Sequence, residues 1–185
     1  MAVTKTVWGY IEGKDMRLMR RMNRWRPPRW IRLWMLIVSR LGDGLLWYVL
    51  GLMLLCFGGL QGFRAFLTGG VASIAAIAIF RKIKPLSRRP RPFQIEPHCW
   101  AIITPPDQFS FPSGHAMTSF AIAASVSHFY PDLQVCLLFS AVSVAVSRIV
   151  LGMHFLTDVV IGALIGAALG FLSVWIFTCL RFIPS

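Results

Sequence analysis

A histidine and an aspartate in the last third of the chain have the spacing that nucleophilic catalysis by an imidazole requires. The stretch 147–158 reads SRIVLGMHFLTD and lies where one long apolar run ends and the next begins. If the second run is helical, His154 and Asp158 share a face, so the carboxylate can hold one ring nitrogen and leave the other free. A neutral imidazole with an anion behind it can form a covalent intermediate. We therefore predict His154 as the nucleophile and Asp158 as the residue that orients it.

A second polar stretch, FPSGH at 111–115, opens another apolar run. Ser113 at a helix N-cap, followed by Gly114, leaves backbone N–H groups free at the positive end of the helix dipole, which is an anion-binding arrangement. His115 follows directly, and we predict that it protonates a leaving group.

Cations for binding an anion come from two places in the sequence. Lys82 and Arg89 belong to the proline-rich segment 81–112, whose prolines rule out one continuous helix across it, and Arg148 belongs to the stretch that contains His154. The predicted phosphate-binding residues are Lys82, Arg89, Ser113, Gly114 and Arg148. We interpret four further cations as headgroup-binding or snorkelling residues, namely Arg81, Lys84, Arg88 and Arg91. Asp43, between two glycines, is interpreted as a turn residue, with a place at the pocket mouth as the alternative.

Two histidines, three cations and a ring of N–H donors suit a tetrahedral phosphate that becomes more highly charged in its transition state. The predicted reaction is phosphate ester hydrolysis: His154 attacks phosphorus, His115 protonates the leaving alkoxide, and water releases phosphate. We expect no metal or other cofactor, because guanidinium and ammonium groups supply the positive charge.

The elements that must position these residues are membrane helices. The chain has 185 residues, 56% of them hydrophobic, with a net charge of +12, and its apolar runs carry arginines at their ends. This pattern predicts an all-α, polytopic membrane helical bundle in a single domain, 1–185, with a basic arm at 1–32 and a transmembrane core at 33–185. About five spans are expected, at 44–60, 63–80, 113–130, 133–151 and 155–177.

Alternation of these spans would bring the ends near 82–91, 112–115 and 147–158 to one membrane face. Residues 30–38 are expected to form an interfacial helix that leads into the first span, and one long tilted helix over 30–60 is the alternative. Three glycines at 162, 166 and 170 form a small-residue stripe that allows close helix packing.

The basic arm 1–32 interleaves arginines with aromatic residues, which predicts an amphipathic helix on anionic headgroups rather than nucleic-acid binding. Nearly every Lys and Arg falls on the face of the predicted site, and only Arg64 and Arg181 fall opposite. The positive-inside rule therefore favours a cytoplasmic site in a bacterial inner membrane, with a periplasmic site as the alternative.

The three stretches resemble the signature motifs of the type 2 phosphatidic acid phosphatase superfamily. The matching residues are Lys82 through Arg89-Pro90, then Pro112-Ser113-Gly114-His115, then Ser147-Arg148 through His154 to Asp158. The resemblance implies a helical fold, metal independence and the roles given above. Because the chain has membrane spans, it is most similar to the lipid phosphatase branch of that superfamily.

The expected substrate is a lipid phosphate such as undecaprenyl pyrophosphate, phosphatidic acid or phosphatidylglycerophosphate. A membrane protein that binds or moves anionic lipids without catalysis is the alternative, although both histidines and Asp158 are present. Haloperoxidase chemistry would call for a soluble scaffold. Headgroup selection is assigned to the loop 93–110, and the sequence leaves the exact lipid and the oligomeric state open.

Overall fold

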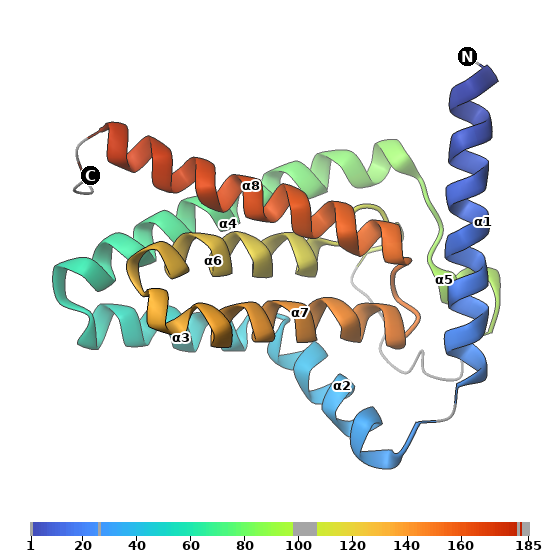
Figure 1. The fold of residues 1–185 in the computed structure, drawn as a ribbon, viewed down its shortest axis with the longest axis horizontal. Coiled ribbons are helices and arrows are strands. Elements are labelled where there is room, and N and C mark those ends of the chain that lie inside the picture. Colours follow the sequence, from blue (N-terminus) through green and yellow to red (C-terminus); the bar gives the residue numbers. More distant parts are fainter. Residues whose placement is uncertain (1, 26, 98–106, 181, 183–185) are drawn as a thin grey trace.

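The structure is a computed structural model that describes residues 2–25, 27–97, 107–180 and 182, and within these residues all secondary structure is helical. This confirms the predicted all-α fold. The helices are α1 (Ala2–Arg24), α2 (Arg29–Leu41), α3 (Leu45–Phe57), α4 (Gly59–Ser87), α5 (Pro92–Ile95), α6 (Gly114–Phe129), η1 (Pro131–Leu133), α7 (Gln134–Val150) and α8 (Leu156–Cys179). Figure 1 shows α3, α4, α6, α7 and α8 side by side as a bundle.

The bundle has the character of a membrane protein. Three helices in the described part are long and apolar enough to cross a bilayer, and the bent pair α2–α3 raises this number to four. The third predicted span, α6, has 16 residues and packs against α4, α7 and α8. Large apolar side chains such as Phe57, Val135 and Leu164 are exposed on the outside of the bundle, where lipid would cover them.

The first span is broken rather than continuous. The axes of α2 and α3 differ by 57°, so the structure has the two helices of the first prediction and not one long helix. The break at 42–44 contains Gly44 with φ of 139°, a conformation that L side chains rarely adopt. Asp43 is carried by this break.

The second span is longer than predicted. We expected it to end at residue 80, before the prolines, but α4 continues through Pro85 to Ser87 and ends at Arg88 in a left-handed conformation. Pro85 has no N–H for the carbonyl four residues earlier, and the helix ends within three residues of it. The extension carries Lys84 to the end of the bundle.

Helices α6 and α8 touch backbone to backbone along the predicted glycine stripe. A Cβ atom added to Gly166 would lie 2.1 Å from the Met117 carbonyl oxygen, and one added to Gly162 would lie 2.6 Å from that of Ser113. No side chain fits at either position. The stripe therefore fixes the start of α6 against the start of α8.

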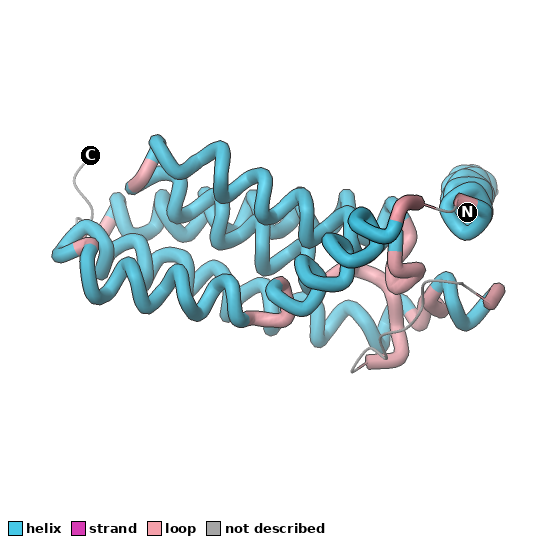
Figure 2. Tube along the Cα trace, turned by 90° about the horizontal axis from the view of Figure 1, so that it is seen from below, coloured by secondary structure: helices cyan, strands magenta, loops and turns pink. Residues whose placement is uncertain are grey.

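Helix α1 lies across the end of the bundle at which α5, the end of α7 and the start of α8 meet (Figure 1). Figure 2, turned by 90°, shows α1 end-on, so its axis is roughly perpendicular to the bundle. On α1, Asp15 and Met19 are buried against the bundle, and Arg17, Arg20, Arg21 and Arg24 line one shallow hollow.

We predict that Gly166→Ala destabilises the protein by about 1–3 kcal/mol, because the methyl group must push α6 and α8 apart. Gly70→Ala in α4 is the matched control, since nothing lies within 4 Å of the added Cβ and the substitution should be neutral or slightly stabilising. Thermal unfolding of the two variants in the same detergent measures the difference. Equal unfolding temperatures would contradict the close approach of α6 and α8.

Candidate active site

His154 lies in the connection between α7 and α8 with only 2% of its surface exposed. Its Nε2 atom faces the guanidinium of Arg91, with Nη1 at 3.4 Å. The same Nη1 donates a hydrogen bond to the Met153 carbonyl oxygen at 2.9 Å, which holds the guanidinium in place. Nε2 is therefore directed at a fixed positive charge.

Asp158 lies behind the other ring nitrogen. Its Oδ2 atom is 3.7 Å from His154 Nδ1 and accepts a hydrogen bond from the Phe155 backbone N–H at 2.8 Å. The spacing of four residues places the two groups together, but 3.7 Å exceeds a hydrogen bond, and among the described residues Nδ1 has no hydrogen-bond partner. Catalytic hydrogen bonds are often long without substrate and shorten in the complex.

The environment of His154 favours the neutral imidazole. Burial, followed by the positive charges of Arg91 and Arg148, holds the pKa of His154 well below its ordinary value of 6.5. Lys84 and His115 act in the same direction. A histidine with this pKa keeps a free lone pair at neutral pH, which a nucleophile needs.

His115, in the first turn of α6, is paired with Asp43. Its Nε2 atom is 2.7 Å from Asp43 Oδ1. Of the two interpretations of Asp43, the structure agrees with the alternative: it lies at the mouth of the pocket, carried there by the bend between α2 and α3. A carboxylate that close favours the protonated imidazole, whereas burial favours the neutral one, so the pair is placed to exchange a proton with a leaving group.

Arg148, at the end of α7, has 2% of its surface exposed. Its Nη1 donates to Ser39 Oγ at 2.7 Å and lies 4.0 Å from Asp43 Oδ1. Within the described residues its Nε has no hydrogen-bond partner. The guanidinium is thus fixed beside His115 and Asp43 with a donor still free.

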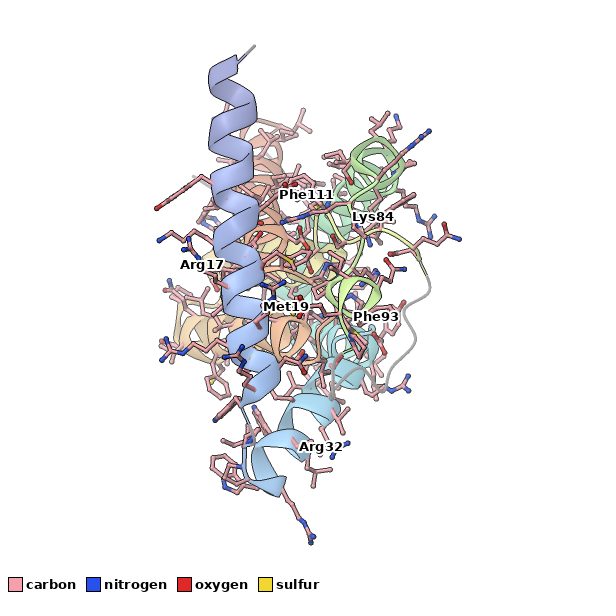
Figure 3. All side chains as sticks on the ribbon, turned by 90° about the vertical axis from the view of Figure 1, so that its right-hand side faces the viewer. Arg17, Met19, Arg32, Lys84, Phe93 and Phe111 are labelled. Atoms are coloured by element: carbon pink, nitrogen blue, oxygen red, sulfur yellow. The ribbon has the colours of Figure 1, made fainter. Side chains whose placement is uncertain are left out.

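Lys84 and Arg91, interpreted above as headgroup-binding or snorkelling cations, lie beside each other and pair with Asp107. Lys84 Nζ is 2.5 Å from Asp107 Oδ2, and Arg91 Nη2 pairs with the other oxygen of the same carboxylate. Burial alone would raise the pKa of Asp107, but hydrogen bonds and charges from Lys84 and Arg91 outweigh it and hold this pKa below its usual value. Asp107 is therefore an anion, and it binds the same two cations that would bind a phosphate group. Figure 3 looks onto this end of the bundle, with Lys84 and Phe93 labelled.

The structure does not place Lys82, a predicted phosphate-binding residue, beside His154. Lys82 is exposed on α4, whereas Lys84 is buried. The pattern lysine, six residues, Arg-Pro occurs twice, once from Lys82 to Arg89-Pro90 and once, two residues later, from Lys84 to Arg91-Pro92. Positions two residues apart on a helix are turned by about 200°, so only one lysine can face the pocket.

Arg89 is likewise not beside the reactive nitrogen. Its Nη1 is 2.5 Å from Asp158 Oδ1 and its Nη2 is 2.6 Å from Asp15 Oδ2. The guanidinium also stacks over the Phe155 ring, 4.3 Å from its centroid. Arg89 therefore lies between the carboxylates of Asp158 and Asp15. The place beside His154 Nε2, where we expected Arg89, is taken by Arg91.

The start of α6 is built as predicted in its backbone. Ser113 is the N-cap, and its hydroxyl accepts a hydrogen bond from the Ala116 N–H at 3.5 Å. The Ser113 N–H donates to the Asp158 carbonyl oxygen at 3.0 Å. The helix N-terminus is thus tied directly to the stretch that contains His154, and Gly114 lines the cavity described next.

A cavity of about 890 Å³ leads away from the site between α3, α4 and α6. One end is polar and includes Asp43, Lys84, Asp107 and His115, and the remainder is lined chiefly by apolar side chains as far as Leu54 and Val126. Its shape and lining match a long apolar chain with a charged head. In the part of the chain that the structure describes, no three His, Cys, Asp or Glu side chains are grouped as metal ligands.

The fold and the pocket together define an all-helical membrane protein with two histidines and buried cations at one end of its bundle. The profile of the PAP2 superfamily matches residues 65–181, which is more than half of the sequence. The chain belongs to the PAP2 superfamily, and the resemblance drawn from its motifs is confirmed.

Two relatives indicate how far the similarity extends. The chain is 37% identical over 108 residues to a decaprenylphosphoryl-5-phosphoribose phosphatase of Mycobacterium tuberculosis, a match that covers 58% of each protein. It therefore spans less than two thirds of that relative. It is 29% identical over 143 residues to an undecaprenyl-diphosphatase of Sulfolobus acidocaldarius, covering 77% of this chain and 68% of the relative.

Two solved structures share the fold. A transmembrane PAP2 type phosphatidylglycerolphosphate phosphatase from Bacillus subtilis superposes with a TM-score of 0.72 at 24% identity, over 91% of this chain and 87% of that one. Aquifex aeolicus LpxE superposes with a TM-score of 0.69 at 27% identity, over 86% and 93%.

We predict that Lys84→Ala weakens the binding of orthophosphate to the solubilised protein by roughly tenfold or more, since a buried charged partner of the anion is lost. Lys82→Ala is the matched control, because it removes the same charge two residues away on the exposed face and should leave binding unchanged. Isothermal titration of both variants with orthophosphate gives the comparison. A larger loss of orthophosphate binding for Lys82→Ala than for Lys84→Ala would favour Lys82 as the phosphate-binding lysine.

Proposed function

We propose that the protein is an integral membrane lipid phosphatase that removes a terminal phosphate through a phosphohistidine intermediate. The observation that carries the proposal is the placement of His154, with Nε2 facing Arg91 at 3.4 Å and Asp158 behind Nδ1. A buried neutral imidazole between a cation and an anion is prepared for attack on a phosphate bound to that cation.

In the proposed first step, the Nε2 lone pair of His154 forms a bond to phosphorus and the bond from phosphorus to the lipid oxygen breaks. His115 gives its proton to the leaving oxygen, and the nearby Asp43 stabilises the imidazolium before transfer. Water then attacks the phosphohistidine, with His115 as the base, and releases phosphate. Members of the proposed oxyanion-binding set are Lys84, Arg91, Arg148, the Ser113 hydroxyl and the Gly114 N–H.

Two features support a lipid as the substrate. The cavity between α3, α4 and α6 joins an apolar interior to the charged site, as a lipid with a phosphorylated head requires. Both sequence relatives carry names that refer to polyprenyl lipids, decaprenyl in one and undecaprenyl in the other. We therefore favour a prenyl-linked phosphate or diphosphate over phosphatidic acid and phosphatidylglycerophosphate.

We predict that His154→Ala lowers phosphate release on the order of ten-thousandfold or more, as expected when a covalent nucleophile is removed. The assay is phosphate release in detergent from a panel of prenyl diphosphates, phosphatidic acid and phosphatidylglycerophosphate. His128→Ala is the matched control, because His128 is exposed at the far end of α6 and its loss should leave turnover unchanged.

The same panel discriminates the alternatives. EDTA should leave the rate unchanged, because side-chain cations are proposed to bind the phosphate. A rate that depends strictly on magnesium, or turnover that survives His154→Ala, would contradict the mechanism. If the wild-type protein binds these lipids but releases phosphate from none of them, the alternative of a non-catalytic lipid-binding protein is favoured.

We propose that the site opens to the cytoplasm of a bacterial inner membrane, because the end of the bundle that carries it also carries α1 and most of the cations. Arg64, by contrast, is near the start of α4 at the other end. A reporter enzyme that is active only in the periplasm, fused before α1, should give no signal in intact cells. A periplasmic signal would reverse the assignment.

A further inference from the structure

Asp15 and Arg89 lie behind the candidate catalytic pair, and the mechanism above does not use them. Asp15 on α1 and Asp158 on α8 are 3% and 0% exposed, and the guanidinium of Arg89 joins them, with distances of 2.6 and 2.5 Å. Arg89 itself is 8% exposed. Helix α1 thus supplies a buried carboxylate, Asp15, that is linked through Arg89 to Asp158, the carboxylate that faces His154.

The contact between α1 and α8 is built around this carboxylate. Asp15 Oδ1 accepts a hydrogen bond from the Thr157 backbone N–H at 3.3 Å, and Oδ2 pairs with the Thr157 hydroxyl. That hydroxyl also accepts from Arg89 Nη1 at 2.8 Å. Each oxygen of Asp15 is therefore used, and the side chain has a fixed position.

Charge decides what this arrangement does. Arg89 holds Asp158 in place, but a guanidinium against one carboxylate cancels its charge, and a neutral pair would stabilise a positive imidazole poorly. With Asp15 the group of two carboxylates and one guanidinium carries one net negative charge. When His154 forms a bond to phosphorus, its ring becomes positive, and this negative charge lies on the Nδ1 side, where it is most useful.

We propose that Asp15 and Arg89 are positioning residues for the reaction: Arg89 fixes Asp158, and Asp15 restores the negative charge that Arg89 would otherwise cancel. The inference rests on the proposed function of His154. It assigns to α1 a part in the chemistry in addition to its predicted place at the membrane surface.

The test compares Asp15→Asn, Arg89→Gln and the double variant in full-length protein, with farnesyl diphosphate as the probe substrate and phosphate release as the assay. Asp15→Asn should lower kcat on the order of tenfold with little change in KM, because the charge acts on the transition state and not on substrate binding. Arg89→Gln should lower kcat as well, since two carboxylates then face each other without a cation. The double variant restores one net negative charge and should exceed Asp15→Asn alone in kcat.

Recovery in the double variant is the result that a purely structural role cannot give, because two losses of packing would add. Glu12→Gln, which removes an exposed carboxylate one turn earlier on α1, is the control and should match wild type. Thermal unfolding in detergent follows the fold of each variant, and Asp15→Asn, which keeps the shape of the side chain, tests the inference even if Arg89→Gln fails to fold.

Two results would overturn the inference: a wild-type kcat for Asp15→Asn, or a double variant with no more activity than Asp15→Asn. His154→Ala separates this failure from failure of the proposed function. If His154→Ala is inactive and the Asp15 series behaves in either of these ways, only the role of Asp15 is lost. If His154→Ala keeps wild-type activity, the proposed function fails.

Discussion

The contact between the backbones of α6 and α8 fixes the geometry on which the rest of the site depends. At Gly162 there is no room for a Cβ beside the Ser113 carbonyl oxygen, and the Ser113 N–H donates to the Asp158 carbonyl oxygen at 3.0 Å. Main-chain atoms of the two stretches that carry the histidines are therefore in direct contact. Main-chain contacts of this kind do not change with side-chain rotamers, so the relative position of the two stretches is set by the fold.

The buried cations impose a second constraint, because unpaired buried charges are costly. Arg91, Arg148 and Lys84 are each less than a tenth exposed, and their carboxylate partners are Asp107 and Asp43. Both carboxylates are themselves partly exposed, with 38% and 44% of the side chain accessible. Under the proposed function, a phosphate group would replace these carboxylates on the cations, and the carboxylates would return to water.

The sequence predicts the helical fold and the meeting of the three stretches at one end of the bundle, and it fails for residues whose position tertiary contacts decide. His154 and Asp158 are four residues apart, and Ser113 and His115 are two apart, so the members of each pair are close along the chain whatever the tertiary contacts. Lys82 and Lys84 both satisfy the lysine to Arg-Pro spacing, and only the buried stripe of α4, which runs through Ala72 and Ala76 toward Lys84, distinguishes them. The contact of Asp15 with residues more than 140 positions later has no local signal at all.

The charges around His154 are arranged along the direction of the proposed electron flow. Burial and the cations on the Nε2 side keep the pKa of the imidazole low, and these cations would also bind the phosphate oxygens. Carboxylates lie on the Nδ1 side, where the ring becomes positive as the bond to phosphorus forms. One set of cations thus serves two needs, a neutral nucleophile before attack and an anion site during it. A site with the cations alone would bind phosphate but would oppose the positive ring, so the carboxylates behind Nδ1 are the part of the arrangement that a binding protein would not require.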